Sequence, residues 1–165
     1  MKTLLIDEET IKKESIIEKN VDSKILSKVI VNIQELYLKE ILGDSLYKSL
    51  IDAVKLFMQS GTTLSQEYTV LLNDYVQPYL IHAVCADFIV MNNYKITNKG
   101  ILKMNDNSAS NASNDDVEYM KNYVDNYVGQ YKKNLIEYLK TINQNQCSSS
   151  STNIANEINS WYFIK

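Results

Sequence analysis

The chain has 165 residues, of which 45% are hydrophobic and 22% charged, and its formal net charge is −3. A chain of this length buries a core without covalent staples, and two cysteines make no disulfide framework. Four glycines and one proline are too few for a β-rich fold dominated by turns. The composition predicts a soluble, single-domain and mainly helical protein.

The basic residues are all lysine, 17 in number, and the sequence contains no arginine. Without arginine there is no guanidinium fork to read guanine bases or to clamp phosphates. The acidic charge balance points the same way. Sequence-specific recognition of nucleic acid is therefore not expected.

Targeting and membrane segments are not expected either. The short apolar start of the chain, residues 1–6, is followed at once by acidic residues, which is unlike a signal peptide. The most apolar stretch, residues 76–91, is too short for a membrane span and contains Pro78, His82 and Asp87. It is typical of a buried helix in a soluble protein.

The first part of the chain predicts two helices. Asp7 is placed to cap a short helix beginning at Glu8. A cap at Asp22 or Ser23 then opens an amphipathic helix that ends at Gly43. Its apolar positions recur at spacings of three and four residues: Leu26, Val29, Ile30, Ile33, Leu36, Tyr37 and Ile41.

The middle of the chain predicts three further helical segments. Asp44 is expected to cap a helix that ends at Ser60 and Gly61. One face of it is apolar: Leu46, Tyr47, Leu50, Ile51, Val54, Phe57 and Met58. Residues 63–66 have the form of a capping box for a helix that carries Tyr68, Leu71, Leu72 and Tyr75. Pro78 is expected to kink that helix or to start a new one.

Residues 79–94 are apolar on nearly every side, which predicts the central helix of a bundle. A turn at residues 97–100 and a low-complexity polar loop at residues 105–116 follow, and Asn114 is expected to cap the last helix. The apolar positions of that helix are Val117, Met120, Val124, Tyr127, Tyr131, Leu135, Tyr138 and Ile142. A second line at four-residue spacing consists of Tyr119, Tyr123, Tyr127 and Tyr131.

The predicted architecture is an all-α helical bundle of four to five main helices with a long polar loop and an extended C-terminal tail. Residues 1–142 form the domain, with the loop 105–116 inside it. Residues 143–153, with four consecutive serines, are expected to be a flexible linker. Residues 154–165 then turn apolar and aromatic and are expected to be a docking segment; their large side chains are Ile154, Ile158, Trp161, Tyr162, Phe163 and Ile164.

The sequence offers little for catalysis. His82, the only histidine, and Cys85 lie three residues apart on one helix face. A zinc site needs three or four ligands, and a cysteine nucleophile needs an orienting group, neither of which the sequence supplies. We interpret both as core residues and predict no catalytic, metal or cofactor site. An enzyme using His82 and Cys85 is the third of three hypotheses, after the two given below.

The order of motifs is more informative than any single one. Residues 34–43 read QELYLKEILG, followed by DSLY at 44–47, VQPYL at 76–80, TNKGI at 97–101 and the tyrosine-rich last helix. This string, over about residues 3–142, resembles the small helical head–tail connector proteins of tailed phages of gut Bacteroidales, including the crAss-like phages. These are also called adaptor or head-completion proteins. The tail after Asn143 matches nothing in that family.

The resemblance implies a virion structural protein, not an enzyme. It implies a homo-oligomeric ring of about twelve copies below the portal that forms part of the DNA conduit. The partners would be the portal, neighbouring tail or connector proteins and passing double-stranded DNA bound without sequence specificity, with no membrane involved. The location would be the head–tail junction of the virion, and the host cytoplasm during assembly.

Interface candidates follow from aromatic residues, which interfaces favour, and from the segments that contact neighbours in the family. They are Trp161, Tyr162, Phe163, Ile164, Ile158, Tyr119, Tyr123, Tyr127, Tyr131, Lys99 and Gly100. The alternative hypothesis is a small helical regulatory or scaffolding protein that binds a single protein partner, with the tail as its recognition segment.

Overall fold

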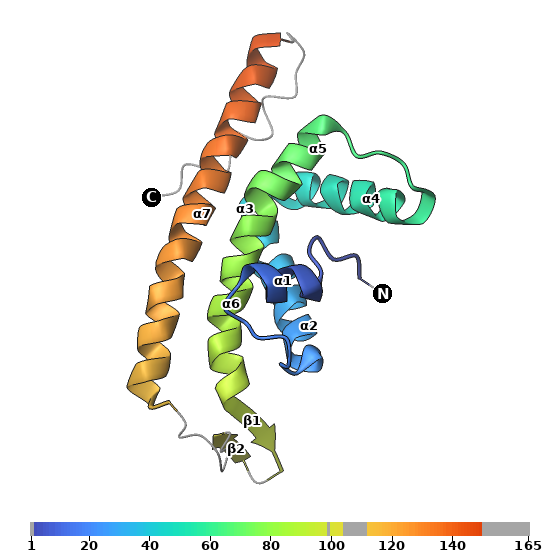
Figure 1. Cartoon of the computed structure of the whole chain (residues 1–165). Helices are drawn as coiled ribbons and strands as arrows, with labels where there is room; N and C mark the ends of the chain where they lie inside the picture. The colour runs from blue at the N-terminus through green and yellow to red at the C-terminus, as the bar shows by residue number, and fades with distance from the viewer. Residues whose placement is uncertain (1, 99, 104–111, 150–165) are drawn as a thin grey trace.

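The computed structural model of the chain describes residues 2–98, 100–103 and 112–149. These residues form an α-helical bundle with one small hairpin, which confirms the all-α prediction (Figure 1). Two of the long helices contain a π-helical segment, labelled η. In chain order the elements are α1 (Glu8–Glu14), α2 (Ser23–Asn32), η1 (Ile33–Leu38), α3 (Lys39–Leu42), α4 (Asp44–Ser60), α5 (Gln66–Val70), η2 (Leu71–Val76), α6 (Gln77–Asn93), β1 (Tyr94–Thr97), β2 (Gly100–Lys103) and α7 (Asn114–Ser149).

Several predicted helix ends are confirmed. The Asp7 carboxylate accepts a hydrogen bond from the Thr10 backbone N–H, and Asp22 accepts one from Lys24. Gly43 and Gly61 both have positive φ, at 75° and 64°, which a side chain would strain, and they end the helices that precede them.

Three predicted caps are wrong. Because the helical hydrogen bonding of α4 already starts from the Gly43 carbonyl, Asp44 lies inside the helix, and its carboxylate pairs with Lys39 at 2.9 Å instead. Ser65, and not the predicted box at residues 63–66, caps α5 by accepting from the Tyr68 N–H. The start of α7 is capped one residue before Asn114, where side chain and backbone of Ser113 and Asp116 bond reciprocally.

The π-helical segment η1 shifts the buried face of the second helix. A π turn makes i→i+5 hydrogen bonds, so it takes up one residue more than an α turn. The predicted core positions Leu36 and Tyr37 are therefore exposed, whereas Gln34 and Leu38 are buried.

The second π-helical segment, η2, ends at Val76, two residues before Pro78. The proline has no N–H to bond to a carbonyl four residues earlier, and its ring crowds that carbonyl. Backbone angles remain helical from η2 into α6, so α5, η2 and α6 form one rod and Pro78 does not divide it. We attribute this continuity to the wider π turn.

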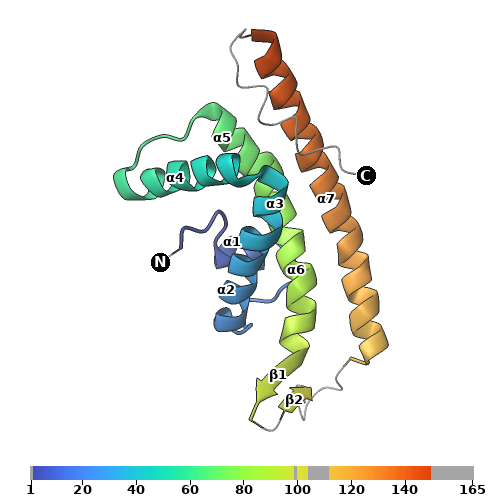
Figure 2. The same ribbon diagram turned by 180° about the vertical axis from the view of Figure 1, so that it is seen from behind.

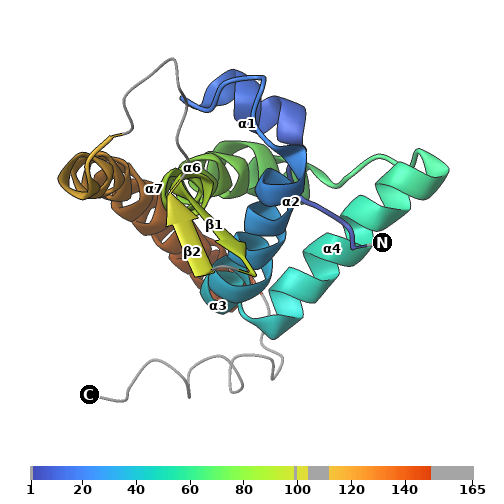
Figure 3. The same cartoon turned by 90° about the horizontal axis from the view of Figure 1, so that it is seen from below.

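The centre of the bundle is α6, as predicted. It packs against α2 and η1 on one side and against α7 along much of its length (Figures 1 and 2). Seen from below, α7 and α4 lie on different sides of the bundle (Figure 3). The buried side chains of α6 come from every face of the helix: Tyr79, Leu80, Ile81, Ala83, Val84, Cys85, Ala86 and Phe88.

The chain from α6 to α7 contains an antiparallel hairpin in which Thr97 pairs with Gly100. The turn predicted at residues 97–100 is therefore present, although the two strands that flank it were not expected.

The end of α7 corrects the predicted linker at 143–153. The helix runs to Ser149, because the polar residues after 142 include neither glycine nor proline to stop it. The rest of that linker and the tail 154–165 lie outside the described residues.

Candidate functional site

The predicted row of tyrosines lies along α7. We call Tyr119, Tyr123, Tyr127 and Tyr131 the tyrosine face. Its exposure falls from 70% at Tyr119 through 50% at Tyr123 and 43% at Tyr127 to a partly buried Tyr131. Four residues advance an α-helix by about 40° more than one turn, so the row winds from solvent toward the core. Tyr119 and Tyr123 are the most exposed of the four, and Tyr127 is exposed in part.

The inner end of the tyrosine face stacks on His82 of α6. The ring centroids of His82 and Tyr131 are 4.6 Å apart, and those of His82 and Tyr127 are 5.6 Å apart, with nearly parallel planes. The Tyr127 hydroxyl lies 2.9 Å from that of Tyr123, which continues the chain of contacts to the surface. Burial lowers the pKa of His82, so the neutral imidazole is favoured at pH 7.

His82 and Cys85 have different surroundings. His82 contacts the α7 tyrosines, whereas Cys85 is buried near the segment between α1 and α2, and burial raises the pKa of its thiol. A raised pKa disfavours the thiolate that a nucleophile or metal ligand needs. Within the described residues, no three His, Cys, Asp or Glu side chains gather as a metal site would require.

A second exposed apolar surface was not predicted. The outer part of α4 extends beyond the bundle, and we call its exposed residues Leu56, Phe57 and Met58 the α4 tip (Figures 1 and 3). The sequence placed Phe57 and Met58 on the buried face of this helix. That face is buried at Tyr47, Leu50 and Val54, but no described element covers its last turns.

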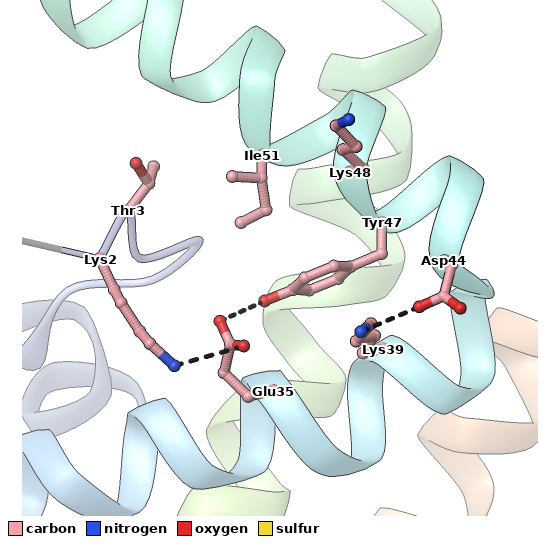
Figure 4. Close-up of a pocket in the computed structure, with 8 residues that line it drawn as sticks. All are labelled: Lys2, Thr3, Glu35, Lys39, Asp44, Tyr47, Lys48 and Ile51. Atoms are coloured by element: carbon pink, nitrogen blue, oxygen red, sulfur yellow. Dashed lines mark hydrogen bonds and ion pairs between the residues drawn. The ribbon is translucent and has the colours of Figure 1, made fainter.

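A charged cavity of about 400 Å³ lies between the chain start and α4 (Figure 4). Lys2 pairs with Glu35 at 3.3 Å, and the Tyr47 hydroxyl donates to the same carboxylate at 3.0 Å. Burial raises the pKa of Tyr47, which keeps its hydroxyl protonated as a donor. Because the carboxylate of Glu35 is already held by two partners, we interpret the cavity as structural.

The cavity adjoins residues 2–6, which we call the N-terminal arm. The buried Gln34 amide, 1% exposed, accepts from the Leu5 N–H at 2.8 Å and donates to the Thr3 carbonyl at 3.0 Å. Gln77 donates to the Leu5 carbonyl at 3.2 Å. A primary amide offers one acceptor and two donors, so it pairs with both backbone groups of the arm. The arm is thus fixed to the bundle by polar contacts.

An apolar groove of about 390 Å³ lies at the other end of the bundle, where the first turns of α7 meet the last turns of α6. We call it the Cys85 groove. Glu18 and Asn92 are exposed at its rim. Its apolar lining includes Ile16, Ile17, Cys85, Phe88, Ile89 and Met120.

Sequence reasoning missed this groove because three segments distant in the chain build it. The available signal was the apolar pair Ile16–Ile17 in a stretch without helical periodicity.

The remaining interface candidates are only partly placed. Gly100 begins β2. The others lie outside the described residues: Lys99, Ile158, Trp161, Tyr162, Phe163 and Ile164.

Comparison with known proteins adds a family and little else. No curated protein and no solved structure matches the chain significantly. Among the helices that the structure describes, none is long and apolar enough to cross a membrane. The sequence profile of a family of unknown function, DUF6712, matches residues 38–154, which run from the end of η1 through α7. Since this match covers more than half of the chain, the protein belongs to the DUF6712 family.

Proposed function

We propose that the protein is a structural subunit of a phage virion. In this role it is a head–tail connector, or adaptor, that assembles as a ring of about twelve copies below the portal. The ring forms part of the conduit through which DNA passes. The order of motifs over residues 3–142 supports this assignment.

One structural observation carries the proposal: the tyrosine face and the α4 tip are two separate apolar surfaces that are exposed among the described residues. The tyrosine face lies on α7 and the α4 tip lies on the other side of the bundle (Figures 1 and 3). Aromatic side chains bury roughly 150–250 Å² each, so each surface offers on the order of a few hundred Å². Surfaces on different sides of a subunit favour head-to-tail contacts, which form a ring when the rotation from one subunit to the next closes.

The charge of the subunit supports a conduit. The net charge is −3 and the basic residues are all lysine, so the subunit has no guanidinium groups with which to clamp phosphates. An acidic wall repels the DNA backbone, which allows DNA to pass without being retained.

The direct test is the native mass of the tagged protein, recovered gently from cells in which the virus is assembling. We expect a megadalton-scale assembly that contains portal and tail proteins. Recovery as a one-to-one complex with a protein that is not part of the virion would overturn the proposal. That outcome would favour the small regulatory or scaffolding protein.

Variants test the two surfaces without disturbing the core. Tyr119→Ser and Phe57→Ser each remove one exposed aromatic ring, and each is expected to lower ring formation by the purified protein. Leu36→Ser, at a residue 64% exposed outside both surfaces, is the matched control and is expected to assemble normally. Normal assembly of both surface variants would contradict head-to-tail contact through these faces.

A further inference from the structure

The Cys85 groove has the features of a docking site for an apolar chain segment. Its volume of about 390 Å³ lies within the range of about 300–1,000 Å³ typical of ligand pockets. Ile16, 64% exposed, and the partly exposed Met120 extend the apolar lining out to the surface. At the rim, Glu18 and Asn92 offer oxygen acceptors. Apolar walls with a polar rim suit an aromatic residue that carries one N–H or O–H.

The chain itself contains a segment of this kind. Residues 150–165 follow α7 and include the only tryptophan, Trp161, with Tyr162, Phe163 and Ile164 directly after it. The indole N–H of a buried tryptophan needs an acceptor, which the rim provides. The segment contains one glutamate and one lysine, Glu157 and Lys165, so no excess of charge opposes its burial.

The reach of the segment decides which copy of the groove it can occupy. At 1.5 Å per residue, Ser149 lies about 44 Å along α7 from Met120 and about 48 Å from Val117. A fully extended chain covers at most about 3.6 Å per residue, which places Trp161 no more than about 43 Å from Ser149. The chain would also have to reverse direction after α7. Trp161 therefore does not reach the groove of its own subunit without being drawn taut.

We propose that the segment 150–165 of one copy docks in the Cys85 groove of another copy, with Trp161 as the anchor. The inference rests on the proposed function only in taking other copies of this chain as the neighbours. Docking between copies adds a contact that is separate from the tyrosine face and the α4 tip. Each subunit would then be linked to a neighbour by that neighbour's residues 150–165.

Trp161 is the only tryptophan in the chain, so tryptophan fluorescence reports on the surroundings of this one side chain. The full-length protein is diluted over several decades of concentration while tryptophan emission and mass by light scattering are followed together. We expect blue-shifted emission in the associated state, and a red shift on dilution that follows the loss of mass. Added peptide with the sequence of residues 150–165 should dissociate the assemblies or shift their mass downward.

The groove is tested by a charge at its rim. Ile16→Lys is expected to abolish the blue shift, because the side chain is exposed and its replacement costs the fold little. Leu36→Lys, at an equally exposed residue elsewhere, is the control and should behave as the native chain does.

Three results would overturn the inference. Emission that stays blue-shifted in the diluted monomer would mean docking within one copy. Water-exposed emission at all concentrations would mean that the tail does not dock on this protein. A blue shift that survives Ile16→Lys would place the tail elsewhere. The proposed connector role fails separately, through the absence of portal proteins from the native assembly, and can stand when tail docking fails.

Discussion

Helices α6 and α7 lie side by side but differ in how much of their surface is exposed to solvent. α6 buries residues on all its faces between α2 and α7, whereas α7 is attached by one stripe that includes Val124 and Leu135 and leaves Tyr119 and Tyr123 exposed. The difference indicates a division of labour. Stability is concentrated in α6 and its neighbours, and the outer surface of α7 is available for association.

The largest effect is expected at the centre of α6. Leu80→Ala removes a side chain that is fully buried and leaves a cavity, so we expect the free energy of unfolding to fall by about 2–5 kcal/mol. Chemical denaturation followed by circular dichroism measures this. Leu36→Ala is the exposed control and is expected to change stability by less than about 0.5 kcal/mol. Similar losses in the free energy of unfolding for the two variants would contradict the conclusion that stability is concentrated in the buried residues of α6.

The next largest effect concerns the polar contacts on the α2 side of α6. Gln34→Leu leaves the Leu5 N–H and the Thr3 carbonyl without their side-chain partner. Buried groups left unsatisfied cost about 1–3 kcal/mol, and we expect a loss of that size in the free energy of unfolding. Gln66→Leu, at an exposed glutamine, is the matched control. An unchanged stability of Gln34→Leu would mean that the hydrogen bonds of Gln34 to the arm contribute nothing to the free energy of unfolding.

The helical framework was predictable because its signals are local. Asp7, Asp22, Gly43 and Gly61 mark helix ends through their own side chains or backbone freedom, and the structure uses each of them. The π-helical segments were not predictable, because an i→i+5 hydrogen bond leaves no mark in residue type. Helical periodicity therefore predicts burial of Leu36 and Tyr37, whereas the structure buries Leu38.

A smaller, pH-dependent effect on the free energy of unfolding is expected at His82, where α6 contacts α7. Burial lowers the pKa of His82 below its ordinary 6.5, so below that pH the unfolded chain binds a proton that the folded chain does not. Stability therefore falls as the pH drops through 6.5, and the loss is complete below the folded-state pKa. His82→Phe keeps a ring against Tyr131 and cannot titrate.

Denaturation of the native chain and of His82→Phe at several pH values between 7.5 and about 5 isolates this contribution. We expect the native chain to lose more stability than the variant over that interval. Parallel curves would show that the imidazole is as accessible to protons in the folded state as in the unfolded chain.

The candidate surfaces were predictable only where one helix builds them. Four-residue spacing of tyrosines is visible along α7 in the sequence, and the structure exposes three of the four. The α4 tip depends on how far α4 extends beyond its neighbours, and the Cys85 groove depends on three separate segments. Local periodicity indicates neither the extension of α4 nor the meeting of the three segments, so these two surfaces can be identified only from the tertiary structure.

The smallest effect on stability is expected at Tyr119, and it is the sharpest test of the division of labour. Its side chain is 70% exposed, so Tyr119→Ser should change the free energy of unfolding by less than about 0.5 kcal/mol. If the outer surface of α7 mediates association, the same variant should lower the assembled fraction at a given protein concentration. Light scattering and denaturation on one preparation give both values. A large loss in the free energy of unfolding would mean that Tyr119 contributes to the core. A variant that is stable and assembles normally would contradict the proposed role of this surface in association.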